Sequence, residues 1–306
     1  MFPIIPANSV AAVSGNDEGI FGFGENSSAN PTAITNLVSN TGVVSSDVAG
    51  VGTARYYISA CEYGGDKGII GFGQNAGGNK SITNLVSNAG VVASDQAATT
   101  GTARYVPSAC SYGEDKGIFG FGHDGSSYVA VTNLVSNAGV VASDVAGVGT
   151  ARAYLAACEY GGDKGIFGFG VYTGGTRTTI TNLVSNVGVV ASDGAGAGTA
   201  RNNIAACRYG GDKGIFGFGT DGSQTAITNL VSNAGVVASD QAAVTGTARS
   251  PSATQYGQDK GIFGYGDTGY PNAVSMTNLV SNAGVVSSDV AGVGTAKMIN
   301  AACSFN

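Results

Sequence analysis

The chain repeats one unit of about 49 residues six times, and this repetition limits the possible folds more than any other feature. The phrase DKGIFGFG, or a close variant of it, recurs at separations of 49, 49, 48, 49 and 47 residues. Its first residues are Asp17, Asp66, Asp115, Asp163, Asp212 and Asp259. A second block follows each phrase and contains TNLVSN, GVV, a Ser-Asp pair and GTAR or GTAK. Such similar units need similar surroundings, which a closed ring or an open stack provides.

Each unit is expected to form four short β-strands, as the fourth unit illustrates. The small-residue segment 155–159 is the first strand, and a Gly-rich turn leads to the second, GIFGFG. Strict alternation along that strand would place Phe167 and Phe169 on one face, with Ile166 and Gly168 on the other. The third strand is ITNLVSN, an Asn-Gly type step then predicts a hairpin, and VVASD is the fourth strand. No segment has the apolar periodicity of a helix.

Four strands in a unit of about 40 to 50 residues are typical of a β-propeller. The sequence therefore predicts an all-β fold, a six-bladed β-propeller with four antiparallel strands per blade, as a single domain over residues 1–306. The aromatic face of one blade would pack on the glycine face of the next, which explains glycines inside strands. Open-ended β-solenoids usually have shorter rungs, so we favour the closed ring.

The units run over residues 9–55, 56–104, 105–152, 153–201, 202–249 and 250–297, and residues 298–306 are then an extra copy of the first strand. Two segments therefore compete for the innermost strand of blade 1, namely 9–14 and 298–304. The C-terminal copy keeps Cys303, whereas the N-terminal copy has Ala12 at that position. We expect the C-terminal copy to fill the place, because pairing the two ends of the chain removes free sheet edges.

The order of these segments resembles the kelch repeat: an Arg, a small-residue strand, GIFGFG where kelch units carry a double glycine, and then NLVSN. Unlike usual kelch units, the chain has no Trp and no Tyr-Asp step. The wording TNLVSNAGVVASDVAGVGTAR followed by YGGDKGIFGFG is similar to repeats in virion-associated and tail proteins of bacterial viruses and in uncharacterised environmental proteins. The resemblance covers nearly the whole chain. It implies a virion-associated or cytoplasmic protein and little about activity.

Charge and hydropathy limit the possible partners. The formal net charge is -6 and no Lys/Arg cluster occurs, so neither nucleic acid nor an anionic membrane is expected as a partner. No apolar run reaches the roughly 20 residues of a membrane-spanning helix. The first residues, MFPIIPANSVAAVSG, lack the positive charge of a signal peptide. A monomeric propeller that contacts a protein or glycan surface is the expectation.

Five cysteines occupy the same position of the repeat. They are Cys61, Cys110, Cys158, Cys207 and Cys303. Bridging them would require equivalent strands to approach more closely than packed sheets do, so we expect buried free thiols.

The repeated basic residues are candidate ligand contacts. A ring near the channel mouth would bind an anion if its charges were unpaired. Its members are Arg55, Arg104, Arg152, Arg201, Arg249 and Lys297. The Ser-Asp aspartate and the Arg that follows it in sequence, such as Asp144 and Arg152, bracket one loop and could instead pair within each blade.

A variable face is the other candidate binding surface. In an antiparallel meander, the loop between strands two and three and the linker between blades lie on the same face. This face would hold the variable loops 25–33, 74–81, 123–130, 171–179, 220–226 and 267–275. It would also hold the residues after the Arg, namely Tyr56, Tyr57, Tyr105, Tyr154, Asn202 and Asn203. Tyr and Asn suit sugar or protein surfaces, since a Tyr ring can stack and still hydrogen-bond.

Catalytic patterns are scarce. The one histidine, His123, lies in a variable loop, which excludes multi-histidine metal centres, and we expect no metal, cofactor or catalytic residue. Glu62, Glu114 and Glu159 lie at neighbouring repeat positions without a sequence pairing that would suggest glycosidase chemistry. A display or attachment module is therefore the leading hypothesis. A lectin with equivalent pockets between blades is the alternative, and an enzyme would need one asymmetric polar pocket.

Overall fold

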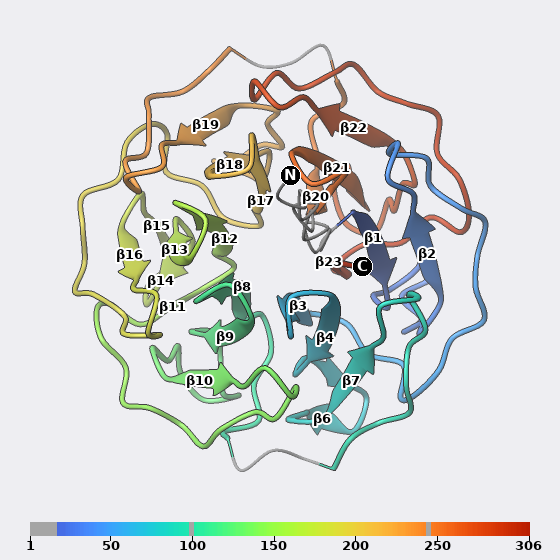
Figure 1. Cartoon of the computed structure of the whole chain (residues 1–306), viewed down its shortest axis with the longest axis horizontal. Coiled ribbons are helices and arrows are strands. Elements are labelled where there is room, and N and C mark those ends of the chain that lie inside the picture. Colours follow the sequence, from blue (N-terminus) through green and yellow to red (C-terminus); the bar gives the residue numbers. More distant parts are fainter. Residues whose placement is uncertain (1–16, 98–100, 243–245) are drawn as a thin grey trace, which may run out of the picture.

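The computed structural model describes residues 17–97, 101–242 and 246–306, and these residues form β-strands with no helix among them (Figure 1). Six three-stranded antiparallel sheets contain most of the strands. Figure 1 shows these sheets arranged around a common centre. We call the strands of each sheet inner, middle and outer by their distance from that centre.

The inner strands are β3 (Ser59–Tyr63), β8 (Ser108–Tyr112), β12 (Ala156–Tyr160), β17 (Ala205–Tyr209), β20 (Ser250–Tyr256) and β23 (Ala301–Phe305). The middle strands are β1 (Glu18–Gly22), β4 (Lys67–Gly71), β9 (Lys116–Gly120), β13 (Lys164–Gly168), β18 (Lys213–Gly217) and β21 (Lys260–Asp267). The outer strands are β2 (Thr35–Val38), β7 (Thr83–Val86), β10 (Thr132–Val135), β16 (Thr181–Val184), β19 (Thr228–Val231) and β22 (Thr277–Val280). A short pair adds β5 (Gln74–Asn75) and β6 (Gly78–Asn79), and a small three-stranded sheet adds β11 (Arg152–Ala153), β14 (Val171–Tyr172) and β15 (Thr176–Arg177).

The fourth segment of each unit is not a continuous strand. In the first unit it joins the outer strand β2 only at isolated bridges, Val38 with Val44 and Thr35 with Val48. Side chains replace much of the missing ladder: the amide of Asn36 donates to the carbonyl of Ser45 at 3.1 Å. The backbone of the fourth segment also bonds to β2, since the N–H of Ser45 donates to the carbonyl of Leu37 at 2.8 Å. The prediction of four strands per unit therefore holds for three strands, and the fourth segment pairs with the outer strand only at isolated bridges.

The inner strands contact one another in a closed cycle, β3 with β8, then β12, β17, β20, β23 and again β3. Between neighbouring sheets, an aromatic ring fills the space over a glycine. A β-carbon placed on Gly168 would lie 2.8 Å from Cζ of Phe216, and one on Gly120 would lie 2.9 Å from Cζ of Phe167. The predicted packing of aromatic rings on strand glycines is present between these sheets.

The prediction that Phe167 and Phe169 share a face is wrong. Phe169 has a φ of 64°, which ends the alternation just after β13. Its ring therefore turns to the face of Ile166 and lies 5.1 Å from the ring of Phe216 in the next sheet. Phe167 packs in the opposite direction, 5.1 Å from the ring of Phe121. This sheet thus contributes aromatic rings to both of its neighbours, whereas the sheet of β4 has Ile70 in place of one of them.

The C-terminal strand β23 completes the first sheet, as we predicted. It pairs antiparallel with β1, with Ile20 opposite Cys303 and Gly22 opposite Ala301. The two strands lie almost the full length of the chain apart in sequence, so this pairing joins the last unit to the first. The competing segment 9–14 lies outside the described residues.

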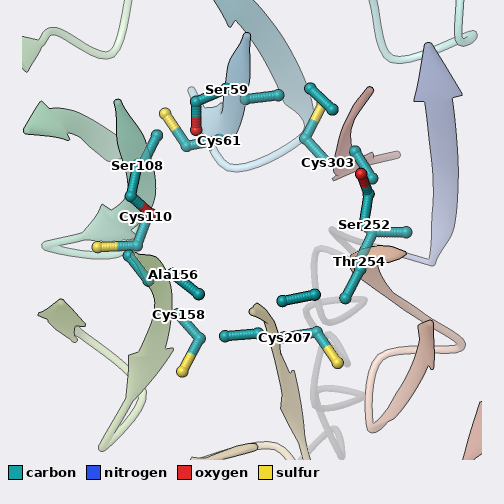
Figure 2. A pocket seen from close by; sticks show the side chains of 18 of the residues that line it. Ser59, Cys61, Ser108, Cys110, Ala156, Cys158, Cys207, Ser252, Thr254 and Cys303 are labelled. Carbon is teal, nitrogen blue, oxygen red and sulfur yellow. The ribbon is translucent and has the colours of Figure 1, made fainter. Parts of the chain in front are cut away.

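All five cysteines are buried with free thiols, which confirms that expectation. Figure 2 shows their side chains directed away from the central cavity, toward neighbouring sheets. The sulfur of Cys158 fills the space over a glycine of the next middle strand, since a β-carbon on Gly214 would lie 2.6 Å from it. Burial raises the pKa of Cys207 to about 12, which keeps that thiol protonated at neutral pH.

Candidate functional site

The repeated basic residues lie between sheets and not at the channel mouth, where we expected them. Arg55 is fully buried, and its guanidinium donates to the carbonyls of Phe72 at 2.9 Å and Thr53 at 3.0 Å and to Oδ1 of Asn84 at 2.7 Å. It lies 4.7 Å from the ring centroid of Phe23, in a cation–π contact. Each of the other members makes the same kind of ring contact; they are Arg104, Arg152, Arg201, Arg249 and Lys297. Because these charges are buried and bonded to protein groups, they do not form an anion site.

The aspartate partners of these residues also differ from our expectation. Asp144 lies 4.0 Å from Arg104 of the preceding linker, and it does not pair with Arg152, the next Arg in sequence. Its carboxylate accepts the backbone N–H of Thr102 at 3.0 Å and the amide of Asn133 at 2.8 Å. Burial alone would raise the pKa of the Asp144 carboxyl, but the hydrogen bonds from Thr102 and Asn133 outweigh this effect, so its pKa is lowered. Asp144 therefore binds the preceding linker to the sheet that contains Asn133, and its role is structural.

The residues after the Arg lie beside the variable loops, as the parity argument predicts. Tyr56 bridges to Gln74, Tyr105 to His123 and Asn202 to Thr220. His123 is held between Tyr105 and Tyr128, with ring centroids at 5.0 and 5.2 Å, and its Nδ1 accepts the N–H of Gly125 at 2.9 Å. These contacts make His123 a structural residue of its loop.

A pocket of about 220 Å³ opens among these linkers, and we call it the mouth pocket. It is lined by side chains from all six linkers. Each linker contributes two or three residues to it, among them Tyr57, Val106, Tyr154, Asn203, Pro251 and Ile299. Asp267 and Tyr270 from the last variable loop complete its wall. Of the predicted binding residues, the structure thus brings Tyr57, Tyr154 and Asn203 together, whereas Tyr56, Tyr105 and Asn202 lie in contact with the loops.

Unusual backbone conformations direct the linker side chains into the mouth pocket. Tyr57, Tyr154 and Asn203 have φ values of 56°, 55° and 51°, a left-handed conformation that is strained for residues other than glycine. Hydrogen bonds between linkers hold this conformation: the N–H of Val106 donates to Tyr57 at 2.8 Å, and that of Asn203 donates to Tyr154 at 2.9 Å. The pocket wall is therefore preorganised by the backbone.

A second cavity, of about 170 Å³, lies between the inner strands, and we call it the channel cavity (Figure 2). At one level of this cavity each inner strand contributes the residue after the cysteine position. These residues form a polar belt of Glu62, Ser111, Glu159, Arg208, Gln255 and Ser304. Unlike the surrounding residues, they differ from repeat to repeat.

Ion pairs and hydrogen bonds connect most of the polar belt. The hydroxyl of Ser111 lies 3.2 Å from a carboxyl oxygen of Glu62 and 2.9 Å from one of Glu159. Arg208 donates to the other oxygen of Glu159 at 2.8 Å, and the hydroxyl of Ser304 donates to Glu62. Burial raises the pKa of Glu159 to about 7, against the opposing effect of Arg208. Glu62 and Glu159 thus belong to one hydrogen-bond network through Ser111, although their spacing in the sequence did not indicate this.

The polar belt was missed by the sequence analysis, although a signal for it exists. Aligning the six copies of the inner strand shows that the position after the cysteine position is charged or polar in every copy, with Glu twice, Ser twice, Arg once and Gln once. Glu114, which we grouped with Glu62 and Glu159, lies instead in a turn with a φ of 70°. The three glutamates therefore do not form one site.

Comparisons with known proteins add no family to these observations. No protein-family model matches the chain, and no curated protein sequence matches it. Within residues 17–97, 101–242 and 246–306, no group of three or more His, Cys, Asp or Glu side chains is arranged to hold a metal ion. The same part of the chain has no helix that could span a membrane.

Proposed function

We propose that the chain is a six-bladed, kelch-like β-propeller that acts as a non-catalytic binding module, with the mouth pocket as the centre of its binding surface. The closed cycle of inner strands and the pairing of β1 with β23 support the propeller, because both are expected of a sheet array closed around an axis. The resemblance to virion and tail proteins supports a role in attachment to a surface.

The observation that carries the proposal is the asymmetry of the mouth pocket. Its wall draws residues from every linker, yet Tyr57, Tyr154 and Asn203 stand where two other linkers have Val106 and Ile299. The middle strands of the sheets, by contrast, are nearly uniform and mostly buried. A varied set of side chains on a rigid uniform scaffold is typical of a recognition surface.

The same observation disfavours a lectin with six equivalent pockets between blades. At the position where such pockets would lie, buried Arg side chains and aromatic rings fill the space between sheets, as Arg152 does over Phe121. One binding site on the axis fits these contacts better than six sites around it.

Binding of the full-length chain to a glycan array and to a displayed peptide library tests this proposal. We expect a ligand in one of the two collections whose binding falls at least tenfold in a variant carrying Tyr57→Ala and Tyr154→Ala. The matched control is Val187→Ala. Val187 is exposed and follows β16 at the end of the sheet where Val184 pairs with Gly165, away from the variable loops. Binding that survives the double substitution, or no ligand in either collection, would contradict the proposal.

A further inference from the structure

The mouth pocket contains a buried polar side chain without a partner. Asn300 is 7% exposed and lines both the mouth pocket and the channel cavity. Neither its side-chain nitrogen nor its side-chain oxygen has a hydrogen-bond partner among the residues that the structure describes. A buried amide without hydrogen-bond partners destabilises the free protein, so a ligand that satisfies both atoms gains affinity.

The position of Asn300 in the repeat makes this amide unusual. By strand register, the equivalent residues are Ile58, Pro107, Leu155, Ile204 and Pro251, and all five are apolar. The neighbouring Ser252 donates its hydroxyl to the backbone carbonyl of Asn300 at 2.6 Å, which leaves the side-chain amide without a partner. The packing of the other repeats shows that the fold has no need of an amide here. A role in binding explains its presence.

The chemistry of the amide indicates what it would bind. A carboxamide offers an acceptor and a donor side by side, and a pair of neighbouring hydroxyls matches both, since each hydroxyl donates and accepts. Asp267 offers further acceptors in the same pocket, and its carboxylate is fixed by the N–H of Gly269 at 3.1 Å and the amide of Gln224 at 3.0 Å. Several hydroxyl-matching groups therefore converge.

The aromatic wall suits the flat apolar face of a sugar ring. The rings of Tyr57 and Tyr154 meet edge to face with centroids 5.8 Å apart, and their hydroxyls hydrogen-bond to each other. Such rings can stack on C–H groups while their hydroxyls stay paired. The left-handed backbone at both tyrosines holds them in place before a ligand arrives.

The charge of the site selects among sugars. Asp267 lines the pocket, and Glu25 is near enough to Tyr57 to influence its ionisation. Among the residues that the structure describes, no Lys or Arg lines the mouth pocket. An anionic sugar would therefore be repelled, whereas a neutral sugar would not.

Building on the proposed function, we propose that the mouth pocket binds one neutral hexopyranose ring, packed against Tyr57 and Tyr154 and hydrogen-bonded through neighbouring hydroxyls to the amide of Asn300. The pocket takes one such ring per chain because Tyr57, Tyr154 and Asn300 meet in one pocket among the linkers.

Saturation-transfer NMR with the full-length chain tests this proposal. The probes are the methyl pyranosides of glucose, galactose, mannose and N-acetylglucosamine, with N-acetylneuraminic acid as the anionic control. We expect saturable binding of at least one neutral sugar and none of the acid. Asn300→Ile, which installs the residue of two other repeats, should weaken that binding at least tenfold while leaving the thermal midpoint equal to or above that of the wild type.

A matched variant, Ile204→Asn, places the same amide at an equivalent position and should not add a second bound sugar. No binding of any neutral sugar, or equal binding by the Asn300→Ile chain, would overturn the inference. If the peptide library yields a ligand that depends on Tyr57 and Tyr154 while no sugar binds, the proposed function stands and the sugar assignment fails.

Discussion

The ring of Phe216 lies directly over the α-carbon of Gly168 in the preceding sheet, so close that a β-carbon there would be 2.8 Å from Cζ of the ring. This contact recurs between sheets and interlocks each with the next. Gly168→Ala should therefore lower the free energy of unfolding by about 1 to 3 kcal/mol through overpacking. Chemical denaturation measures the change.

The control for this substitution is Gly77→Ala. A β-carbon on Gly77 would meet only the side-chain ends of Asn75 and Lys80, both at 3.2 Å and both on a surface loop. Its free energy of unfolding should stay within about 0.5 kcal/mol of the wild type. Equal stability of the Gly168 and Gly77 variants would show that the sheets are not interlocked as described.

Lys297 is the one lysine in a position that five other repeats give to arginine. Its ammonium is buried 4.5 Å from the ring centroid of Tyr265, and burial lowers its pKa to about 7. Lys297→Arg should raise the free energy of unfolding by about 1 kcal/mol, because a guanidinium can bind the surrounding carbonyls as Arg55 does. The reverse substitution, Arg55→Lys, should lower it.

The same lysine predicts a pH dependence. Its folded pKa lies below the unfolded value of 10.5, so the unfolded chain binds more protons between these values and stability rises with pH above about 7. The rise is cleanest from pH 7 to about 8.5, before unfolded thiols ionise. Denaturation curves across this window should slope upward for the wild type and be flatter for Lys297→Arg. Parallel slopes would contradict a buried, titrating Lys297.

Strand β23 joins the two ends of the chain, so its loss should open the array. Deleting residues 301–306 leaves β1 without its inner neighbour and exposes the apolar side chains of Ile20 and Phe21. The shortened chain should unfold at a much lower denaturant concentration and associate in size-exclusion chromatography. An unchanged midpoint in a monomeric chain would show that this pairing does not hold the fold together.

Thiol titration checks the packing of the cysteines. Each sulfur is buried against a neighbouring sheet, as Cys158 is against Gly214, and burial raises the pKa of the thiols. A thiol reagent at pH 8 should modify none of the five in the folded chain within minutes and all five after denaturation. Rapid labelling of the folded chain would contradict the packing.

The sequence predicted the features that follow from repetition and strand alternation. Three features depend on local pattern or on chain parity. They are three of the four strands predicted per unit, the closing role of Cys303 and its neighbours, and the joint position of Tyr56 and the loop at Gln74. These properties are encoded within one unit or in the order of units, so one sequence was sufficient to predict them.

The failures share a different cause. Phe169 changes face because of a left-handed φ at a residue type that rarely adopts it. Arg55 is buried because groups 17 and 29 residues away, the carbonyl of Phe72 and the side chain of Asn84, satisfy its guanidinium. The polar belt at Glu62 and Glu159 forms only when strands from different repeats meet on the axis. Each depends on contacts between units, which spacing within a unit does not encode.

The number of ligands bound per chain tests the central claim most directly, since the claim is that a uniform scaffold presents one asymmetric site on its axis. Native mass spectrometry of the full-length chain, titrated with a ligand selected on the glycan array or from the peptide library, counts them. The account predicts saturation at one ligand per chain, with that single species lost in the Tyr57 and Tyr154 double variant. A series of up to six equivalent bound ligands that persists in the double variant would contradict it.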